Sequence, residues 1–226
     1  MRVSEILKKC LRNKNFILGS CMVGLMVLIM VVGFFYMPYD PDVMDTEHEL
    51  QFFSAAHPLG TDQFGRDILS RIMEGTRVSF LVGALTVVFG LLVGGAVGAV
   101  AGYYGGKIDE VIMKLIDTQM AFPGVLLALM LIAVFGNSLQ NLILALGVMS
   151  IPRFARISRS GFIKYRDAEF IKAARSRGAG DGRIIFLHIL PNIVPELIVT
   201  SSLGFAGAVM SEAGLSYLGL GIQPPT

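Results

Sequence analysis

The feature of this sequence that most restricts its fold is a set of three stretches without a charged side chain, at residues 15–39, 78–106 and 118–152. A helix crosses about 30 Å of hydrocarbon with roughly 20 residues, so each stretch is long enough to span a bilayer. Hydrophobic residues make up 54% of the chain and charged residues only 16%, and the charges are clustered. This pattern predicts an all-α, polytopic membrane protein rather than a soluble domain.

The third stretch is too long for one crossing and is expected to form two helices. Gly136-Asn137-Ser138, near its middle, favours a tight turn, and the second helix should extend to about Phe154, with Arg153 reaching toward the lipid headgroups. A fifth span is expected at residues 191–211. Three prolines are expected at span ends, where a missing backbone donor costs least, with a gating kink as the alternative for the first: Pro123, Pro152 and Pro191.

The distribution of charge predicts the orientation, because Lys and Arg are retained on the cytoplasmic side. Residues 1–14 contain five basic residues and one acidic residue, whereas residues 40–74 contain eight acidic and two basic residues. We therefore expect a cytoplasmic segment at 1–14, an anchor helix at 15–39 and an external loop at 40–77. The interval 153–191, with nine basic residues, is then cytoplasmic.

The external loop is expected to contain an amphipathic helix. Phe64, Ile68, Leu69 and Ile72 recur at helical spacing and would form its apolar side. On the opposite side, Asp67 and Arg71 are spaced for an ion pair. Such a helix would lie at the membrane interface and lead into the second span.

The charged interval 153–191 has the composition of a docking element. Residues 167–177 favour a helix with Phe170, Ile171 and Ala174 on one side. Gly178 can adopt the left-handed turn that closes a helix, and Asp181 can cap a second one. Small side chains let another surface approach this first helix, while Phe170 and Ile171 would form an apolar knob.

This interval resembles the EAA loop in the membrane subunits of binding-protein-dependent ABC importers. The matching residues are Ala173, Ala174, Gly178, Leu190 and Pro191, whereas Lys172 and His188 depart from the usual pattern. A second group of residues resembles the signature of the C-type subunit in the dipeptide, oligopeptide and nickel branch. It comprises Leu59-Gly60-Thr61-Asp62, Gly65-Arg66-Asp67, Ser70-Arg71, Gly75, Arg77, Ser79, Leu218-Gly219-Leu220-Gly221 and Pro224-Pro225.

The resemblance implies a type I ABC importer transmembrane fold in a bacterial inner membrane, with residues 78–226 as the permease core and a sixth span beyond residue 226. The chain would form half of a pathway for di- or oligopeptides, with nickel or metal chelates as the alternative cargo. The implied partners are a second, homologous permease subunit in a heterodimer, two cytoplasmic ATPase subunits and an external substrate-binding protein. The residues implied in coupling to the ATPase are Glu169, Phe170, Ile171, Lys172, Ala173, Ala174 and Gly178.

No cofactor is expected on this chain, and ATP with magnesium would bind to the partner ATPases. Gly105-Gly106-Lys107 lacks the spacing of a phosphate-binding loop. His188 has no second ligand at metal spacing, which argues against a metal site. The charge balance of +2 does not indicate nucleic-acid binding.

Two further groups of residues are candidates for a role in transport. Glycines at four-residue steps in the second span form a bare stripe, which indicates either a fixed packing seam or a sliding surface: Gly90, Gly94, Gly98 and Gly102. Glu212, with Met210 and Ser211 beside it, interrupts an apolar run. An acid at membrane depth favours a gate or a contact with the cargo, with a place in the headgroup layer as the alternative.

Two other functional classes fit less well. An intramembrane enzyme would need a zinc-binding pair, paired aspartates or a serine with a nearby base, and the spans contain none of these patterns. An ion channel would need a selectivity filter or repeated acidic positions, which are also absent from the sequence. Neither class accounts for the docking element.

Overall fold

The computed structural model describes residues 12–221 of the chain. Most of the basic N-terminal residues, Cys10 and the Pro224-Pro225 pair therefore lie outside the described residues, as would any sixth span. The chain divides into two compact units, one up to Val78 and the other from Ser79 onward.

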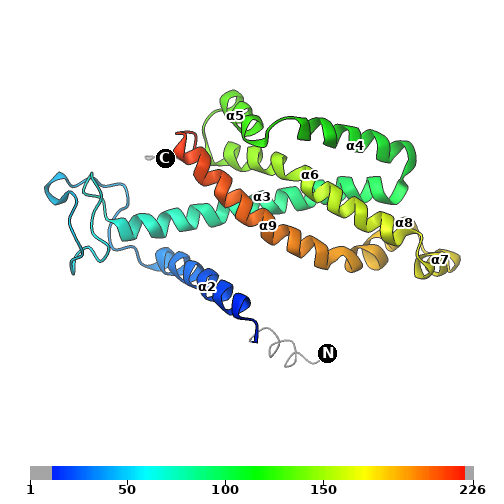
Figure 1. Cartoon of the computed structure of the whole chain (residues 1–226), viewed down its shortest axis with the longest axis horizontal. Helices are drawn as coiled ribbons and strands as arrows, with labels where there is room; N and C mark the ends of the chain where they lie inside the picture. Colours follow the sequence, from blue (N-terminus) through cyan, green and yellow to red (C-terminus); the bar gives the residue numbers. More distant parts are fainter. Residues whose placement is uncertain (1–11, 222–226) are drawn as a thin grey trace. The chain divides into compact units, whose positions relative to one another are not determined.

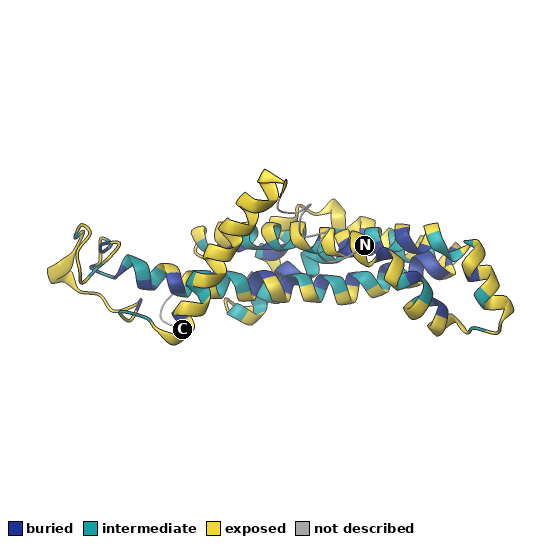
Figure 2. Cartoon of the chain, turned by 90° about the horizontal axis from the view of Figure 1, so that it is seen from below, coloured by how far each residue is buried: buried dark blue, intermediate teal, exposed yellow. Residues whose placement is uncertain are grey.

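The first unit contains α2 (Lys14–Phe35), which begins where Asn13 caps the free backbone N–H groups of Asn15 and Phe16. Nearly every side chain of α2 is apolar and exposed, as Figure 2 shows. Its one buried residue is Gly33, where the absence of a side chain makes room for Met73. By length and apolar composition this helix can cross a membrane, and its role as an anchor stays a prediction.

The helix expected to begin at Phe64 begins at Ile68 instead and continues without a break into the second uncharged stretch (α3, Ile68–Tyr104). Asp67 lies at the start of this helix, and its Oδ2 accepts hydrogen bonds from the Ser70 backbone N–H at 2.8 Å and hydroxyl at 2.7 Å. The carboxylate is thus engaged with the first turn. The predicted ion pair between Asp67 and Arg71 is wrong.

Arg71 binds Asp62 instead, in the loop that precedes α3. Arg66 Nε also donates to Asp62 Oδ2 at 2.9 Å. Burial alone would raise the pKa of the Asp62 carboxyl, but the Phe64 N–H and the two guanidinium groups outweigh it and lower this pKa to about 2. Asp62 therefore joins several parts of this loop, which also contains η1 (Thr46–His48).

The second unit contains the rest of α3 and all later helices (Figure 1). These are α4 (Gly106–Ala121), α5 (Gly124–Phe135), α6 (Leu139–Arg166), α7 (Glu169–Ser176), α8 (Asp181–Arg183), η2 (Ile184–Ile189) and α9 (Leu190–Tyr217). α6 packs against α4, α5 and α9. The described residues form helices and loops, which confirms the predicted helical fold class.

The glycine stripe of α3 lies directly against α6. An ideal Cβ on Gly98 would stand 2.1 Å from the Ala155 carbonyl oxygen, and one on Gly94 would stand 2.5 Å from the Ile151 carbonyl oxygen. Gly90 and Gly102 are similarly close to α6. The two backbones approach so closely because these positions have no side chain.

The breaks between helices agree only in part with the prolines and glycines of the sequence. Gly136 has φ +91° in the turn between α5 and α6, which confirms the predicted turn. Pro123 separates α4 from α5, whose axes differ by 87°. Pro152 was expected at a span end but lies inside α6, which continues to Arg166 rather than ending near Phe154.

By length and apolar composition, three described helices can cross a membrane: α2, α3 and the continuous helix from Asp181 to Tyr217. The bent pair of α4 and α5 makes a fourth if it counts as one span. α5 alone, with 12 residues, is about 18 Å long, which is shorter than the hydrocarbon layer. α6 is long enough, but its second half is strongly basic.

Candidate functional site

The charged interval folds as a short helix, a left-handed turn and a second helix, as predicted. α7 ends in a Schellman motif, in which the Ala179 N–H donates to the Ala174 carbonyl at 3.1 Å and the Gly178 N–H to the Arg175 carbonyl at 2.9 Å. Gly178 has φ +82°, a conformation that L side chains disfavour. The turn directs the chain into α8 and, through the π-helical η2, into α9.

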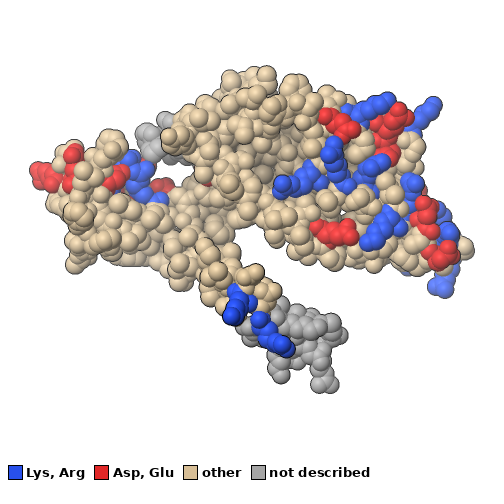
Figure 3. Space-filling view, in the orientation of Figure 1, with Lys and Arg blue, Asp and Glu red and all other residues tan. Residues whose placement is uncertain are grey.

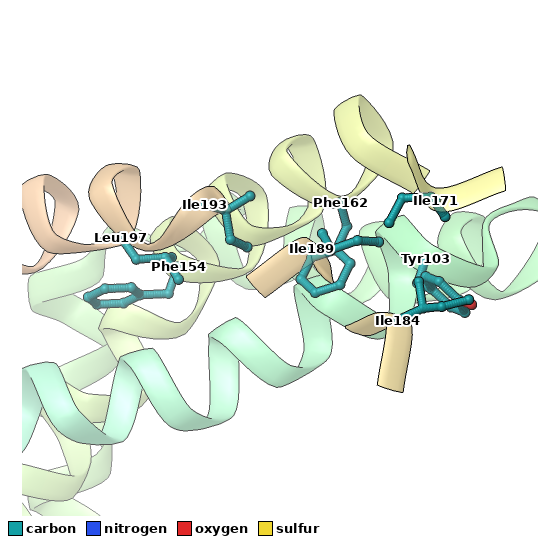
Figure 4. Close-up of a cluster of buried hydrophobic side chains, with 8 residues drawn as sticks. All are labelled: Tyr103, Phe154, Phe162, Ile171, Ile184, Ile189, Ile193 and Leu197. Atoms are coloured by element: carbon teal, nitrogen blue, oxygen red, sulfur yellow. The ribbon is translucent and has the colours of Figure 1, made fainter. Parts of the chain in front are cut away.

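α7 is fixed to the bundle by a cluster of buried apolar side chains (Figure 4). Ile171 is fully buried there, beside Phe162 of α6, Tyr103 of α3, and Ile184 and Ile189 of η2. Burying such a side chain contributes about 1.5–3 kcal/mol. Ile171 therefore holds α7 in place, which corrects the expectation that it forms part of the exposed knob.

A polar network beside this cluster ties the turn to the end of α3. The Tyr103 hydroxyl donates to Asp181 Oδ1 at 2.5 Å and accepts from Arg175 Nη2 at 3.2 Å. Asp181 was expected to cap the second helix, but Gly180 occupies the capping position and the Asp181 carboxylate faces Tyr103. The tyrosine thus links side chains from either side of the Gly178 turn.

The opposite side of α7 is exposed. Phe170 is 45% exposed, and Ala173 and Gly178 are also exposed, while Ala174 is half-buried. Glu169 Oε1 accepts a hydrogen bond from Lys172 Nζ at 2.9 Å, and this contact raises the pKa of the lysine. The surface available to a partner therefore consists of one aromatic side chain, small residues and a charged pair.

Two ion pairs that no sequence pattern indicated join α4 to α6 in the second unit. Arg156 Nη2 donates to Asp117 Oδ1 at 2.6 Å, and Arg159 Nη2 donates to Asp109 Oδ2 at 2.6 Å. Figure 3 shows that, in the second unit, basic and acidic side chains gather at the end of the bundle that carries α7 and α8. That end is strongly polar, whereas the remaining visible surface of the unit is largely uncharged.

The candidate gate residues have different surroundings. Glu212 is 7% exposed, and its carboxylate accepts hydrogen bonds from Ser79 of α3 at 3.0 Å and from Ser216 at 2.8 Å. Met210 and Ser211 line a cavity of about 250 Å³ between α5, α6 and α9. The acid thus joins α9 to α3, while its two neighbours face open space.

Among residues 12–221, no group of three or more His, Cys, Asp or Glu side chains is arranged to hold a metal ion. Within the same residues, Cys21 is a free and exposed cysteine on α2.

Residues 94–226 match the family described as binding-protein-dependent transport system inner membrane component. The chain is 41% identical to the dipeptide transport system permease protein DppC of Alkalihalophilus pseudofirmus, over 98% of this chain and 73% of the relative. It is 39% identical to the glutathione transport system permease protein GsiD of Pectobacterium atrosepticum, over 98% of this chain and 74% of that relative. It is 41% identical to DppC of Escherichia coli K12, over 95% of this chain and 74% of that relative.

A solved structure of similar fold is that of the MetNI methionine ABC transporter in inward-facing conformations. The TM-score is 0.59 at 21% sequence identity, over 66% of this chain and 75% of that chain. At this identity the similarity concerns the fold alone.

Proposed function

The chain belongs to the family of binding-protein-dependent transport system inner membrane components, and on that premise we propose that it forms half of the membrane pathway of a peptide importer. Its fold is that of a type I ABC importer membrane subunit. Relatives named for dipeptide and glutathione transport, at about 40% identity over nearly the whole chain, support di- or oligopeptides as the cargo.

Four partners complete the proposed machine: a second, homologous permease subunit, two ATPase subunits that bind ATP and magnesium, and an external substrate-binding protein. The exposed side of α7 would dock on an ATPase, with Phe170 as the apolar contact and Ala173 allowing close approach. The concentration of basic residues around α7 supports a cytoplasmic position for this surface (Figure 3). The five basic residues among residues 1–14 support a cytoplasmic N-terminus by the same rule.

The proposed coupling runs from α7 into the bundle through two connections. Ile171 packs against side chains of α3, α6 and η2, so a displacement of α7 must move all three. Tyr103 adds a directional link from the turn to α3. Closing of the ATPases would then shift the bundle between inward-open and outward-open arrangements, because each arrangement makes different contacts with α7.

In this proposal the other candidate residues pack helices together or line a cavity. The close approach of α3 and α6 along Gly90, Gly94, Gly98 and Gly102 supports a fixed packing seam rather than a sliding surface. Ser211 and Met210 line a cavity, which supports a place beside the pathway, and Glu212 would brace α9 against α3.

The observation that carries the proposal is an exposed α7 surface on a rigidly anchored helix. The proposal is tested by reconstituting the chain in liposomes with the neighbouring permease, ATPase and binding proteins. Uptake is then measured for a panel of peptides and, as the alternative cargo, for nickel and a nickel chelate. We expect ATP-dependent peptide uptake and a disulfide crosslink from Ala173→Cys to an ATPase cysteine. Labelling of that cysteine by an impermeant thiol reagent from outside the cell would refute the proposed orientation, and uptake of nickel alone would refute peptide as the cargo.

A further inference from the structure

α6 carries three arginines at three-residue spacing, and one of them differs from the others. Arg156 and Arg159 form ion pairs with Asp117 and Asp109 of α4. Arg153 forms no ion pair or hydrogen bond with any residue in the described part of the chain. Arg153 is exposed on this chain and lines two cavities, so its unpaired guanidinium is free to bind an anion from elsewhere.

Two cavities meet at Arg153. A cavity of about 170 Å³ is lined by Arg153 together with Thr86 of α3, Ser150 of α6 and Ser211 of α9. A second cavity, of about 300 Å³, is lined by the same arginine and by Gln119 of α4. Small-molecule sites typically measure roughly 300–1,000 Å³, so the two cavities together have room for a small peptide.

The smaller cavity contains a buried hydroxyl without a partner. Thr86 is 2% exposed, and within residues 12–221 its Oγ1 has no hydrogen-bond partner. The neighbouring Ser150 hydroxyl donates instead to the Gly147 carbonyl at 2.7 Å. Buried hydroxyls are nearly always hydrogen-bonded, so an unpaired one in a cavity wall indicates that a polar group enters the cavity.

The charges around the cavity leave Arg153 as the group that would attract an anion. Asp117 and Asp109 are engaged by the two other arginines, and Glu212 is bound to Ser79 and Ser216 and lines neither cavity. No acidic side chain lines either cavity. The smaller cavity is therefore lined by an unpaired cation and by a residue whose buried hydroxyl has no partner in the described part of the chain.

We propose that this cavity binds the carboxylate of a peptide, with Arg153 holding the carboxylate and Thr86 hydrogen-bonding a backbone amide of the same ligand. This inference rests on the proposed function. A guanidinium accommodates a carboxylate through two parallel hydrogen bonds. An acidic side chain of the second permease subunit could also pair with Arg153, but it would leave the recessed Thr86 hydroxyl unpaired, so the cavity favours a small ligand that carries both groups.

The test measures binding directly, on the complete permease and ATPase complex in lipid nanodiscs without binding protein. Equilibrium dialysis compares radiolabelled trialanine with its C-terminal amide, on wild type, Arg153→Gln and Arg153→Lys. Loss of a charge-assisted hydrogen bond weakens binding about 10- to 100-fold. Wild type should therefore bind trialanine more tightly than the amide by that factor. R153Q should lose this preference, and R153K should recover part of it.

A second variant keeps the proposal testable if R153Q fails to fold. Thr86→Val removes an unpaired hydroxyl at constant shape, which leaves folding unharmed. T86V should therefore bind trialanine about 5-fold or more weakly, in keeping with the loss of one hydrogen bond. The matched control is Thr200→Val, because Thr200 is also buried in a helix but already bonds the Glu196 carbonyl at 2.8 Å. T200V should leave the affinity unchanged.

Several outcomes would overturn the inference. They are equal binding of acid and amide by wild type, an acid preference that survives in R153Q, or wild-type affinity in T86V. Loss of the second permease subunit from R153Q would also overturn it, by assigning Arg153 to the interface. All of these leave the importer proposal intact if the wild-type complex still takes up peptide in liposomes, whereas failure of that uptake refutes the importer proposal itself.

Discussion

Replacing Gly178 with valine is the sharpest test of the proposed coupling role of its turn, because at this position backbone strain can be separated from crowding. Gly178 has φ +82°, and an added Cβ would meet nothing within 4 Å. The substitution therefore acts only through the left-handed backbone, at a cost of about 1–2 kcal/mol. That energy lowers the population of the native turn by a factor of roughly 5–30 relative to other arrangements of α7.

The assay is the number of ATP molecules hydrolysed per peptide taken up by the reconstituted importer. We expect G178V to assemble normally but to hydrolyse several times more ATP per peptide, with faster amide exchange in α7. Gly180→Val is the matched control, because Gly180 has φ −73° and equally open surroundings. If G178V and G180V behave alike, the left-handed turn does not matter for coupling and the reasoning fails.

Three further predictions follow from other parts of the structure. Tyr103→Phe keeps the buried ring but removes the hydrogen bond to Asp181, so the turn should lose about 1 kcal/mol of stability. A protease should then cut the turn faster, whereas the same change at the exposed Tyr104 should have no effect. Gly98→Val places a Cβ against the α6 backbone and should abolish accumulation of folded protein in membranes; normal accumulation would disprove the close packing. The lowered pKa of Asp62, about 2 against an ordinary 3.8, stabilises the loop before α3 by about 2 kcal/mol above pH 4, and this stabilisation should disappear as the pH falls through 2. Pepsin cleavage of the loop between pH 4 and 2 measures this loss, and Asp62→Asn should reduce the pH dependence, leaving the part due to Asp45 and Asp67, whose pKa values are also lowered by their hydrogen bonds.

The parts of the fold that the sequence predicted depend on short-range signals. Gly136 and Gly178 were placed correctly in turns because glycine readily takes a positive φ. Long uncharged runs likewise predicted α2 and α3, because a membrane helix needs only length and apolarity. Such signals are read from neighbouring residues and need no tertiary information.

The parts that the sequence did not predict depend on contacts between distant residues. Ile171 and Phe170 are adjacent and both apolar, and the positions of α3, α6 and η2 decide which of them is buried. The Arg156–Asp117 pair joins residues 39 positions apart, so no local pattern indicates it. Pro152 reads as a helix end in isolation, yet α6 accommodates it because the surrounding helices supply the packing.

The π-helical turn at η2 (Ile184–Ile189) has a consequence for the whole rod from Asp181 to Tyr217. A π-turn accommodates one residue more than an α-turn, and one residue corresponds to about 100° of rotation about the helix axis. The π-turn therefore sets the angle between the η2 side chains that contact Ile171 and the side chains of α9. Deleting one residue from η2 would rotate Asp181 and Ile184 by about 100° relative to α9 and so remove them from their contacts with Tyr103 and the apolar cluster.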